Sequence, residues 1–141
     1  MVRLRSLFLL ILCATIAHAQ DITGRWVTID DATHKPRSVV EITLRGDKAY
    51  GHIVKLFRDP GEDPDPVCDK CDNDDGRYNE KVIGMEIIRD MVRDGDAWND
   101  GTILDPKNGS VYDCKLWVEQ GKLHVRGYLL FFYRTQEWVR E

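Results

Sequence analysis

The stretch Trp98–Val118 reads WNDGTILDPKNGSVYDCKLWV, and its pattern decides the fold. Two runs of residues suited to β-strands flank the turn Asp105-Pro106-Lys107-Asn108-Gly109. Asn-Gly supplies the positive φ angles that tight hairpin turns require, and Pro106 fixes the backbone where the turn begins. The stretch therefore predicts a β-hairpin that carries wide aromatic side chains on one or both faces.

Other strands are predicted on both sides of this hairpin. Val40, Ile42 and Leu44 alternate with polar residues, and this period of two is typical of a half-buried strand. The apolar spacing in residues 82–92 also fits a helix, but Gly84 and the β-branched residues favour a strand. The predicted strands are residues 24–29, 39–44, 49–57, 82–92, 97–104, 110–118, 122–129 and 133–140.

The short turns between most of these runs predict antiparallel pairing of successive strands. Eight antiparallel strands in sequence can close on themselves, which removes the exposed sheet edges. We therefore predict an all-β fold, a single antiparallel barrel of about eight strands. A barrel of this size is either filled by its own side chains or holds one small ligand.

The N-terminal residues are typical of a secretory signal peptide. Arg3 and Arg5 give a basic start, an apolar run follows, and Ala17-His18-Ala19 has the small-residue pattern of a cleavage site. We predict that residues 1–19 are removed and that residues 20–141 form one domain in the periplasm or outside the cell. The apolar run is too short for a spanning helix, so we expect no stable membrane insertion.

Residues 20–141 are acidic. With Arg3 and Arg5 removed, 18 of the 20 basic residues remain against 24 acidic residues, a net charge of −6. No basic patch is available to neutralise phosphate groups, so we expect no nucleic-acid partner.

Residues 58–80 interrupt the strand pattern and are rich in aspartate and proline. A segment of this length predicts a long surface loop that is functional or mobile. Its acidic residues do not fit the spacing of a calcium-binding EF-hand, because Cys71 and Val82 would occupy the first and last ligand positions. We expect a solvated loop without a cofactor, with a looser cation site as the less favoured alternative.

Cys68, Cys71 and Cys114 remain after cleavage of the signal peptide. An oxidising compartment favours a disulfide, and the odd number leaves one thiol over. We predict a loop-closing bond between Cys68 and Cys71, with a bond from Cys114 to one of that pair as the alternative. Redox and zinc chemistry lack their usual contexts, a βαβ unit and a second close cysteine pair.

Aromatic residues and one arginine are the candidate ligand contacts. Ligand pockets are mostly apolar with a few placed polar groups, and an arginine facing the lumen can hold a carboxylate through two hydrogen bonds. Arg126, which lies between Val125 and Gly127, is the candidate for that role. The alternative is a barrel filled by its own aromatic rings, with Arg126 in a structural ion pair. The candidate ligand contacts are Tyr50, Tyr112, Trp117, Arg126 and Tyr128.

Several blocks of the sequence carry a resemblance to a known family. They include Gly24-Arg25-Trp26, Tyr50-Gly51-His52-Ile53-Val54, Cys68-x-x-Cys71, Gly101-Thr102-Ile103-Leu104-Asp105-Pro106 and Arg134-Thr135-Gln136-Glu137-Trp138. Together they resemble the secreted bacterial proteins catalogued as domain of unknown function 2147. The resemblance implies a periplasmic lipocalin-like barrel and brings no established activity. Leu129-Leu130-Phe131-Phe132 departs from it, because a turn with glycine is expected there.

The Gly-x-Trp block is also similar to the signature of the lipocalins. That likeness implies that Trp26 packs at the closed end of the barrel, with Arg134 or Arg140 across its ring. We accordingly expect Gly24, Trp26, Arg134 and Trp138 to close the barrel and not to contact a ligand.

The sequence favours a periplasmic module that binds a small apolar or amphipathic ligand. The alternative is a cell-envelope interaction or stress protein with a filled core, which contacts a partner through residues 58–80. An enzyme is the least supported class, because no catalytic constellation is visible. The sequence leaves the ligand and the oligomeric state open.

Overall fold

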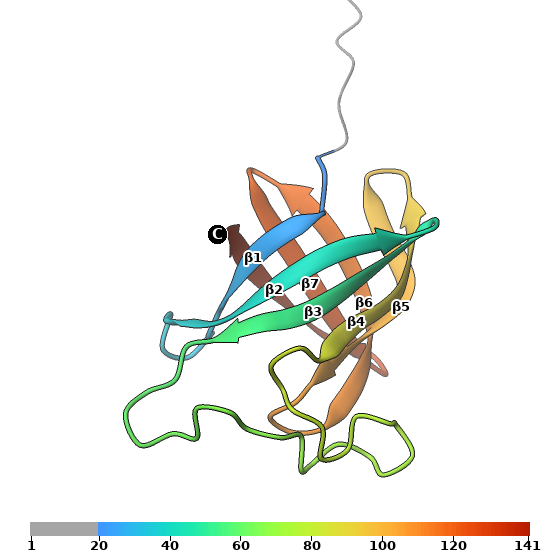
Figure 1. Ribbon diagram of the computed structural model, residues 1–141. Helices are drawn as coiled ribbons and strands as arrows, with labels where there is room; N and C mark the ends of the chain where they lie inside the picture. Colours follow the sequence, from blue (N-terminus) through green and yellow to red (C-terminus); the bar gives the residue numbers. More distant parts are fainter. Residues whose placement is uncertain (1–19) are drawn as a thin grey trace, which may run out of the picture.

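Eight antiparallel strands close into a barrel in which each strand pairs with its neighbours in the sequence (Figure 1). They are β1 (Gly24–Ile29), β2 (Pro36–Arg45), β3 (Lys48–Leu56), β4 (Glu86–Asp94), β5 (Ala97–Asp105), β6 (Ser110–Glu119), β7 (Lys122–Leu129) and β8 (Phe132–Arg140). The computed structural model describes residues 20–141, so the predicted signal peptide lies outside the described residues. The predicted all-β barrel is confirmed.

The hairpin of β5 and β6 turns at the Asn-Gly motif. The carbonyl oxygen of Asp105 accepts hydrogen bonds from the backbone N–H groups of Asn108 (3.3 Å) and Gly109 (2.8 Å). The carboxylate of Asp105 accepts another from the N–H of Lys107 (2.9 Å). Gly109 has a φ of +74°, which glycine adopts without steric cost. Asp105 therefore caps the turn that aligns the two strands.

β4 begins at Glu86 and not at Val82, where the prediction placed its start. Gly84 has a φ of +92°, and its N–H donates to the carbonyl oxygen of Ile53 (2.6 Å). The pairing of β3 with β4 shifts between Gly51 and His52, which marks a β-bulge. The prediction was too early because the apolar residues before Glu86 belong to a packed loop and not to the strand.

Residues 57–85, which we call the cross-linked loop, expose most of their acidic side chains, as expected, but several of their other side chains are buried against the barrel. Cys68 and Cys71 form the predicted disulfide, and both are buried in the apolar core together with Val82 and Met85. The N–H of Cys68 donates to the carbonyl oxygen of Glu80 (2.9 Å), which ties the two sides of the loop together. The acidic composition did not predict this packing, because only a few apolar residues of the loop make the contacts with the core.

The barrel has two different ends (Figure 1). One end, which we call the closed end, carries the turns at 46–47, 95–96 and 120–121 and the segment 20–23. The open end carries the turns at 30–35, 106–109 and 130–131 and the cross-linked loop. Buried side chains fill the closed half; they include Trp26, Ile42, Ala49, Met91, Leu116, Leu123 and Trp138. The part of the chain that the structure describes has no helix long and apolar enough to cross a membrane.

Candidate ligand-binding site at the open end

Four of the five predicted ligand contacts lie on the outer face of the barrel. Along β7 the buried side chains are Leu123 and Val125, and because successive side chains of a strand point to opposite faces, Arg126 points outward. Arg126 is the direct cross-strand partner of Thr135. The expectation that Arg126 faces the lumen is therefore wrong, because its apolar neighbours take the inner positions. Tyr50, Trp117 and Tyr128 point outward by the same alternation.

These outward residues form contacts that brace the barrel wall. The guanidinium of Arg126 lies 5.1 Å from the ring centre of Trp117 and 4.3 Å from that of Tyr133. Its Nε donates to Thr135 Oγ1 (2.7 Å), and the ring of Trp117 stacks on His124 at 5.0 Å. Cation–π contacts with the rings of Trp117 and Tyr133 hold Arg126 on the outer face of the barrel.

Tyr50 has its own outward partners. Its hydroxyl donates to Asp90 Oδ1 (2.8 Å), and the guanidinium of Arg45 lies 3.5 Å above its ring. The bond from the Tyr50 hydroxyl, together with Lys48 and Arg45 nearby, holds the pKa of Asp90 below its ordinary value. Tyr50 therefore links β3 to β4 and lies away from the lumen.

Tyr112 is the one predicted ligand contact that points inward, in phase with the buried Cys114 and Leu116. Its hydroxyl oxygen accepts a hydrogen bond from Asn108 Nδ2 (3.2 Å). A β-carbon on Gly127 would lie 3.4 Å from the β-carbon of Tyr112, so glycine leaves space beside the tyrosine side chain. Tyr112, Gly127 and the inward Ile103 are all partly exposed.

The closed end is sealed by Trp26 and Arg140. The Arg140 guanidinium lies 3.9 Å above the centre of the Trp26 ring. Its Nη1 and Nη2 donate to the carbonyl oxygens of Thr23 and Asp21, each at 2.6 Å. A β-carbon on Gly24 would lie 2.9 Å from Arg140 Nη1, so glycine leaves the space that the guanidinium uses. Of the two arginines left open by the sequence, Arg140 lies across the tryptophan and Arg134 does not.

Arg134 lies at the open end instead. It pairs with Gly127 on β7 and shares the inward phase of Gln136 and the buried Trp138. Asp31, in the turn between β1 and β2, accepts hydrogen bonds from Arg134 Nε (2.6 Å) and Gln136 Nε2 (3.2 Å). Counting back by twos from Trp138 would have identified Arg134 as the inward arginine. Sequence reasoning missed Asp31 because its contact spans more than a hundred residues.

The turn that carries Asp31 is built by Asp30. The carboxylate of Asp30 accepts hydrogen bonds from the N–H groups of Thr33 (2.8 Å) and Ala32 (3.0 Å). These bonds, with that from the Thr33 hydroxyl, hold the pKa of Asp30 below its ordinary value. Asp30 thus fixes a compact turn and leaves the carboxylate of Asp31 directed toward β8.

A groove lies outside the barrel beside the ion pair of Arg134 with Asp31. β1 and β8 pair at two positions, Trp26 with Arg140 and Val27 with Val139. Where this pairing stops, a groove of about 390 Å³ is lined by Ile29, Asp31, His34, Lys122, Thr135, Glu137 and Val139. Its volume is within the range of small-molecule sites, ~300–1,000 Å³. Asp31 therefore borders both this groove and Arg134, whose side chain is 68% exposed.

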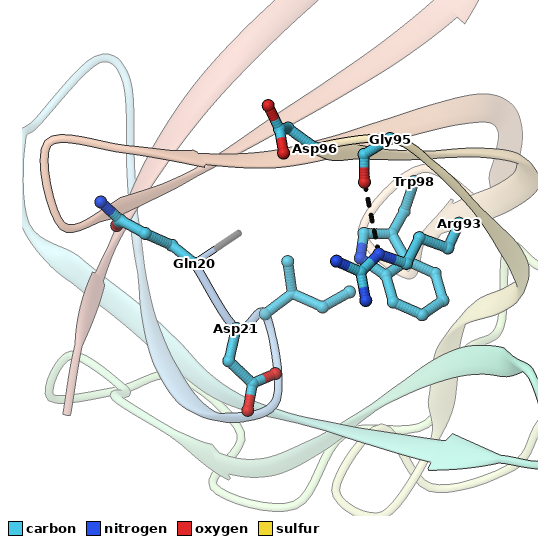
Figure 2. Close-up of a pocket in the computed structure, with 7 residues that line it drawn as sticks. Gln20, Asp21, Arg93, Gly95, Asp96 and Trp98 are labelled. Carbon is cyan, nitrogen blue, oxygen red and sulfur yellow. Dashed lines mark hydrogen bonds between the residues drawn. The ribbon is translucent and has the colours of Figure 1, made fainter. Parts of the chain in front are cut away.

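A second pocket lies at the closed end, between the segment 20–22 and the turn at 95–96. Figure 2 shows Gln20 and Asp21 on one side of it and Arg93 and Trp98 on the other. Arg93 Nε donates to the carbonyl oxygen of Gly95 (3.3 Å). The volume of about 180 Å³ is below the usual size of a ligand site.

The thiol of the third cysteine, Cys114, is unreactive at neutral pH. Cys114 is free and buried, and burial raises the pKa of its thiol to about 12. At neutral pH it is protonated and is therefore a poor nucleophile. In residues 20–141, no three His, Cys, Asp or Glu side chains are grouped so that they could hold a metal ion.

Comparison with known proteins agrees with this architecture. The chain resembles the solved structure of protein HP1028 from the human pathogen Helicobacter pylori, which is described as belonging to the lipocalin family. The two have a TM-score of 0.72 and 16% sequence identity over 86% of this chain and 83% of HP1028, so the likeness concerns the fold. No curated protein sequence matches the chain significantly.

The sequence itself also matches a family. A family described as "Uncharacterized protein conserved in bacteria (DUF2147)" matches residues 24–140, which include all eight strands. The chain therefore belongs to the DUF2147 family of bacterial proteins, and its fold is that of a lipocalin.

Proposed function

We propose that the protein binds one small amphipathic ligand in the open half of its barrel. The observation that carries this proposal is the partial exposure of the inward-facing Ile103, Tyr112, Gly127 and Gln136, beside a closed half that is filled by buried side chains. An eight-stranded barrel is either filled by its own side chains or holds one small ligand, and this exposure favours the second. The apolar part of the ligand would lie against Ile103 and Tyr112.

Arg134 would bind the polar end of the ligand. A guanidinium holds a carboxylate through two parallel hydrogen bonds, and the carboxylate of Asp31 is the partner of Arg134 in the structure. The Asp31 carboxylate then stands in for the ligand's anionic group and would exchange with it. A ligand that combines an anionic group with an apolar chain fits this arrangement.

We place this activity in the bacterial periplasm. The Cys68–Cys71 disulfide supports an oxidising compartment, and the signal-like features of residues 1–19 support export. The acidic net charge of residues 20–141 suits a soluble carrier better than a nucleic-acid binder.

The alternative function is an envelope interaction or stress protein that contacts a partner through residues 58–80. Two observations favour it: both pockets described above lie outside the lumen, and buried side chains fill the closed half. On this alternative the barrel carries no ligand, and deletion of residues 72–75 at the tip of the loop would abolish capture of a partner by cross-linking in cells.

Ligand binding is tested directly with dodecanoate and its uncharged analogue dodecanol. Native mass spectrometry after mild extraction reports any co-purifying ligand, and calorimetric titration reports the affinity of each probe. We expect Arg134→Gln to weaken dodecanoate binding about tenfold, the loss of roughly one charged hydrogen bond, and to leave dodecanol binding unchanged. Arg126→Gln is the matched control, because Arg126 faces outward on the neighbouring strand. Failure of the unaltered protein to bind either probe, with no co-purifying ligand, would count against the proposal.

A further inference from the structure

The turn between β7 and β8 exposes an unusual run of apolar side chains. Leu130, Phe131 and Phe132 are 88%, 97% and 77% exposed, and the flanking Leu129 and Tyr133 are exposed as well. Single exposed apolar residues are common on protein surfaces, but contiguous ones mark interaction sites. These five residues, which we call the apolar tip, stand at the open end of the barrel.

The backbone of the turn that carries the apolar tip is strained at Leu130. The other two-residue hairpin turns of residues 20–141 are Gly46-Asp47, Gly95-Asp96 and Gln120-Gly121, and each contains a glycine with positive φ. The turn of β7 and β8 has Leu130-Phe131, and Leu130 has a φ of +54°. A leucine disfavours this conformation, which suits glycine or asparagine. Backbone strain of this kind is retained where a side chain serves a function.

Two arginines of this hairpin lie near the apolar tip. Residues 123–136 contain Arg126 and Arg134 and neither aspartate nor glutamate, although Asp113 on β6 is the cross-strand partner of Tyr128. Arg134 is paired with Asp31. In the described part of the chain Arg126 has no carboxylate within 4.0 Å and is held against Trp117 and Tyr133.

The side chains are ordered by polarity along the hairpin. The leucine and phenylalanine side chains are outermost, Tyr128 and Tyr133 follow, with ring centres 6.0 Å apart, and Arg126 lies 4.3 Å from the ring centre of Tyr133. A bilayer presents the matching order: hydrocarbon, then an interface that attracts aromatic rings, then headgroups that attract cations when they are anionic.

We propose that the apolar tip inserts into the surface of a bilayer that contains anionic phospholipid. Leu130, Phe131 and Phe132 enter the boundary of the acyl chains, while Tyr128 and Tyr133 lie at headgroup level and Arg126 contacts lipid phosphate. The contact is peripheral and reversible, because one hairpin turn buries little apolar surface compared with a spanning segment. This inference goes beyond the proposed ligand binding and does not depend on it.

The test is flotation of the purified protein with lipid vesicles. One set is phosphatidylethanolamine with about one quarter phosphatidylglycerol, and the other is phosphatidylcholine alone. We expect co-flotation with the anionic vesicles, a clear decrease in high salt, and little co-flotation with phosphatidylcholine. The double variant Leu130→Asn with Phe131→Gly should abolish flotation and raise the midpoint of urea unfolding, because Asn-Gly suits the turn.

The controls separate the membrane from other occupants. Leu44→Ser removes an exposed apolar side chain at the closed end and should leave flotation unchanged. Sedimentation velocity of the unaltered protein detects self-association through the apolar tip. Absence of flotation, equal flotation with phosphatidylcholine, flotation that survives the double variant, or a dimer lost in that variant without vesicle binding would each overturn the proposal.

Discussion

The carbonyl group of Lys70 occupies the space that a β-carbon on Gly109 would need. Gly109 therefore serves two purposes: it supplies the positive φ of the β5–β6 turn, and it lets the cross-linked loop approach that turn. A further contact brings Cys68 Sγ to 3.6 Å from the carbonyl oxygen of Pro106. The β5–β6 turn thus also positions the loop at the open end.

Replacement of Gly109 by alanine should destabilise the protein by about 3 kcal/mol, from backbone strain at positive φ and displacement of the loop. Gly61→Ala is the matched control, because Gly61 also has positive φ but has no atom near its missing β-carbon. That change should cost about 1 kcal/mol, from strain alone. Urea unfolding measures both. Equal losses in the two variants would mean that the contact with Lys70 contributes nothing.

Arg140→Gln should lower the free energy of unfolding by about 2 kcal/mol, because the variant loses the cation–π contact with Trp26 and both bonds to the backbone carbonyls. Arg140→Lys retains the charge but not the planar guanidinium that donates two hydrogen bonds. Its free energy of unfolding should therefore lie between those of the parent protein and Arg140→Gln. Arg25→Gln breaks an exposed ion pair with Glu41 and should change stability by about 0.5 kcal/mol or less. If Arg140→Gln behaved like Arg25→Gln, Arg140 would not seal the closed end.

The buried thiol of Cys114 predicts a loss of stability in alkali. The ordinary thiol pKa of 9.0 is raised to about 12 in the folded protein, so above pH 9 the unfolded chain releases a proton that the folded chain keeps. The free energy of unfolding then falls by up to about 1.4 kcal/mol per pH unit as the pH rises toward 12. Cys114→Ala should remove this part of the slope. Identical slopes in the parent protein and the variant between pH 9 and 11 would refute the assignment.

Reduction of the Cys68–Cys71 disulfide should loosen the cross-linked loop and leave the barrel intact. The amides of Cys68, Asn79 and Val82 donate to carbonyl oxygens within the loop, so their hydrogen exchange should accelerate. The amide of Val125, within β7, should exchange as before. Cys114→Ala is the appropriate background, because the disulfide is then the only thiol chemistry in residues 20–141. Accelerated exchange throughout β7 would show instead that the loop and the barrel unfold together.

Much of the fold could be predicted because its signals are local. The alternation of Val40, Ile42 and Leu44 and the glycine-containing turns are read within a few residues, and they led to eight antiparallel strands. The start of β4 was predicted too early, because the bulge at Glu86 depends on pairing with β3. Packing of the cross-linked loop was missed because it depends on the meeting of Lys70 with Gly109, two residues far apart in the chain.

The residues predicted for the ligand site do not lie together in the structure. An inward-facing arginine was expected at Arg126, whereas the inward arginine at the open end is Arg134. The phase of each strand was the missing step: Leu123 and Val125 fix the inward phase of β7, and Trp138 fixes that of β8. The contact of Arg134 with Asp31 requires the closed barrel, so no local pattern could have predicted it.

The most direct test of the account is to map where dodecanoate binds by nuclear magnetic resonance of the isotope-labelled protein. The account predicts saturable shifts at the amides of Ile103, Tyr112, Gly127 and Gln136, and at the side chain of Arg134, with little change at Arg126 or Trp117. Shifts confined to the outer face of β6 and β7, or no shifts at saturating dodecanoate, would contradict a ligand site in the open half of the barrel.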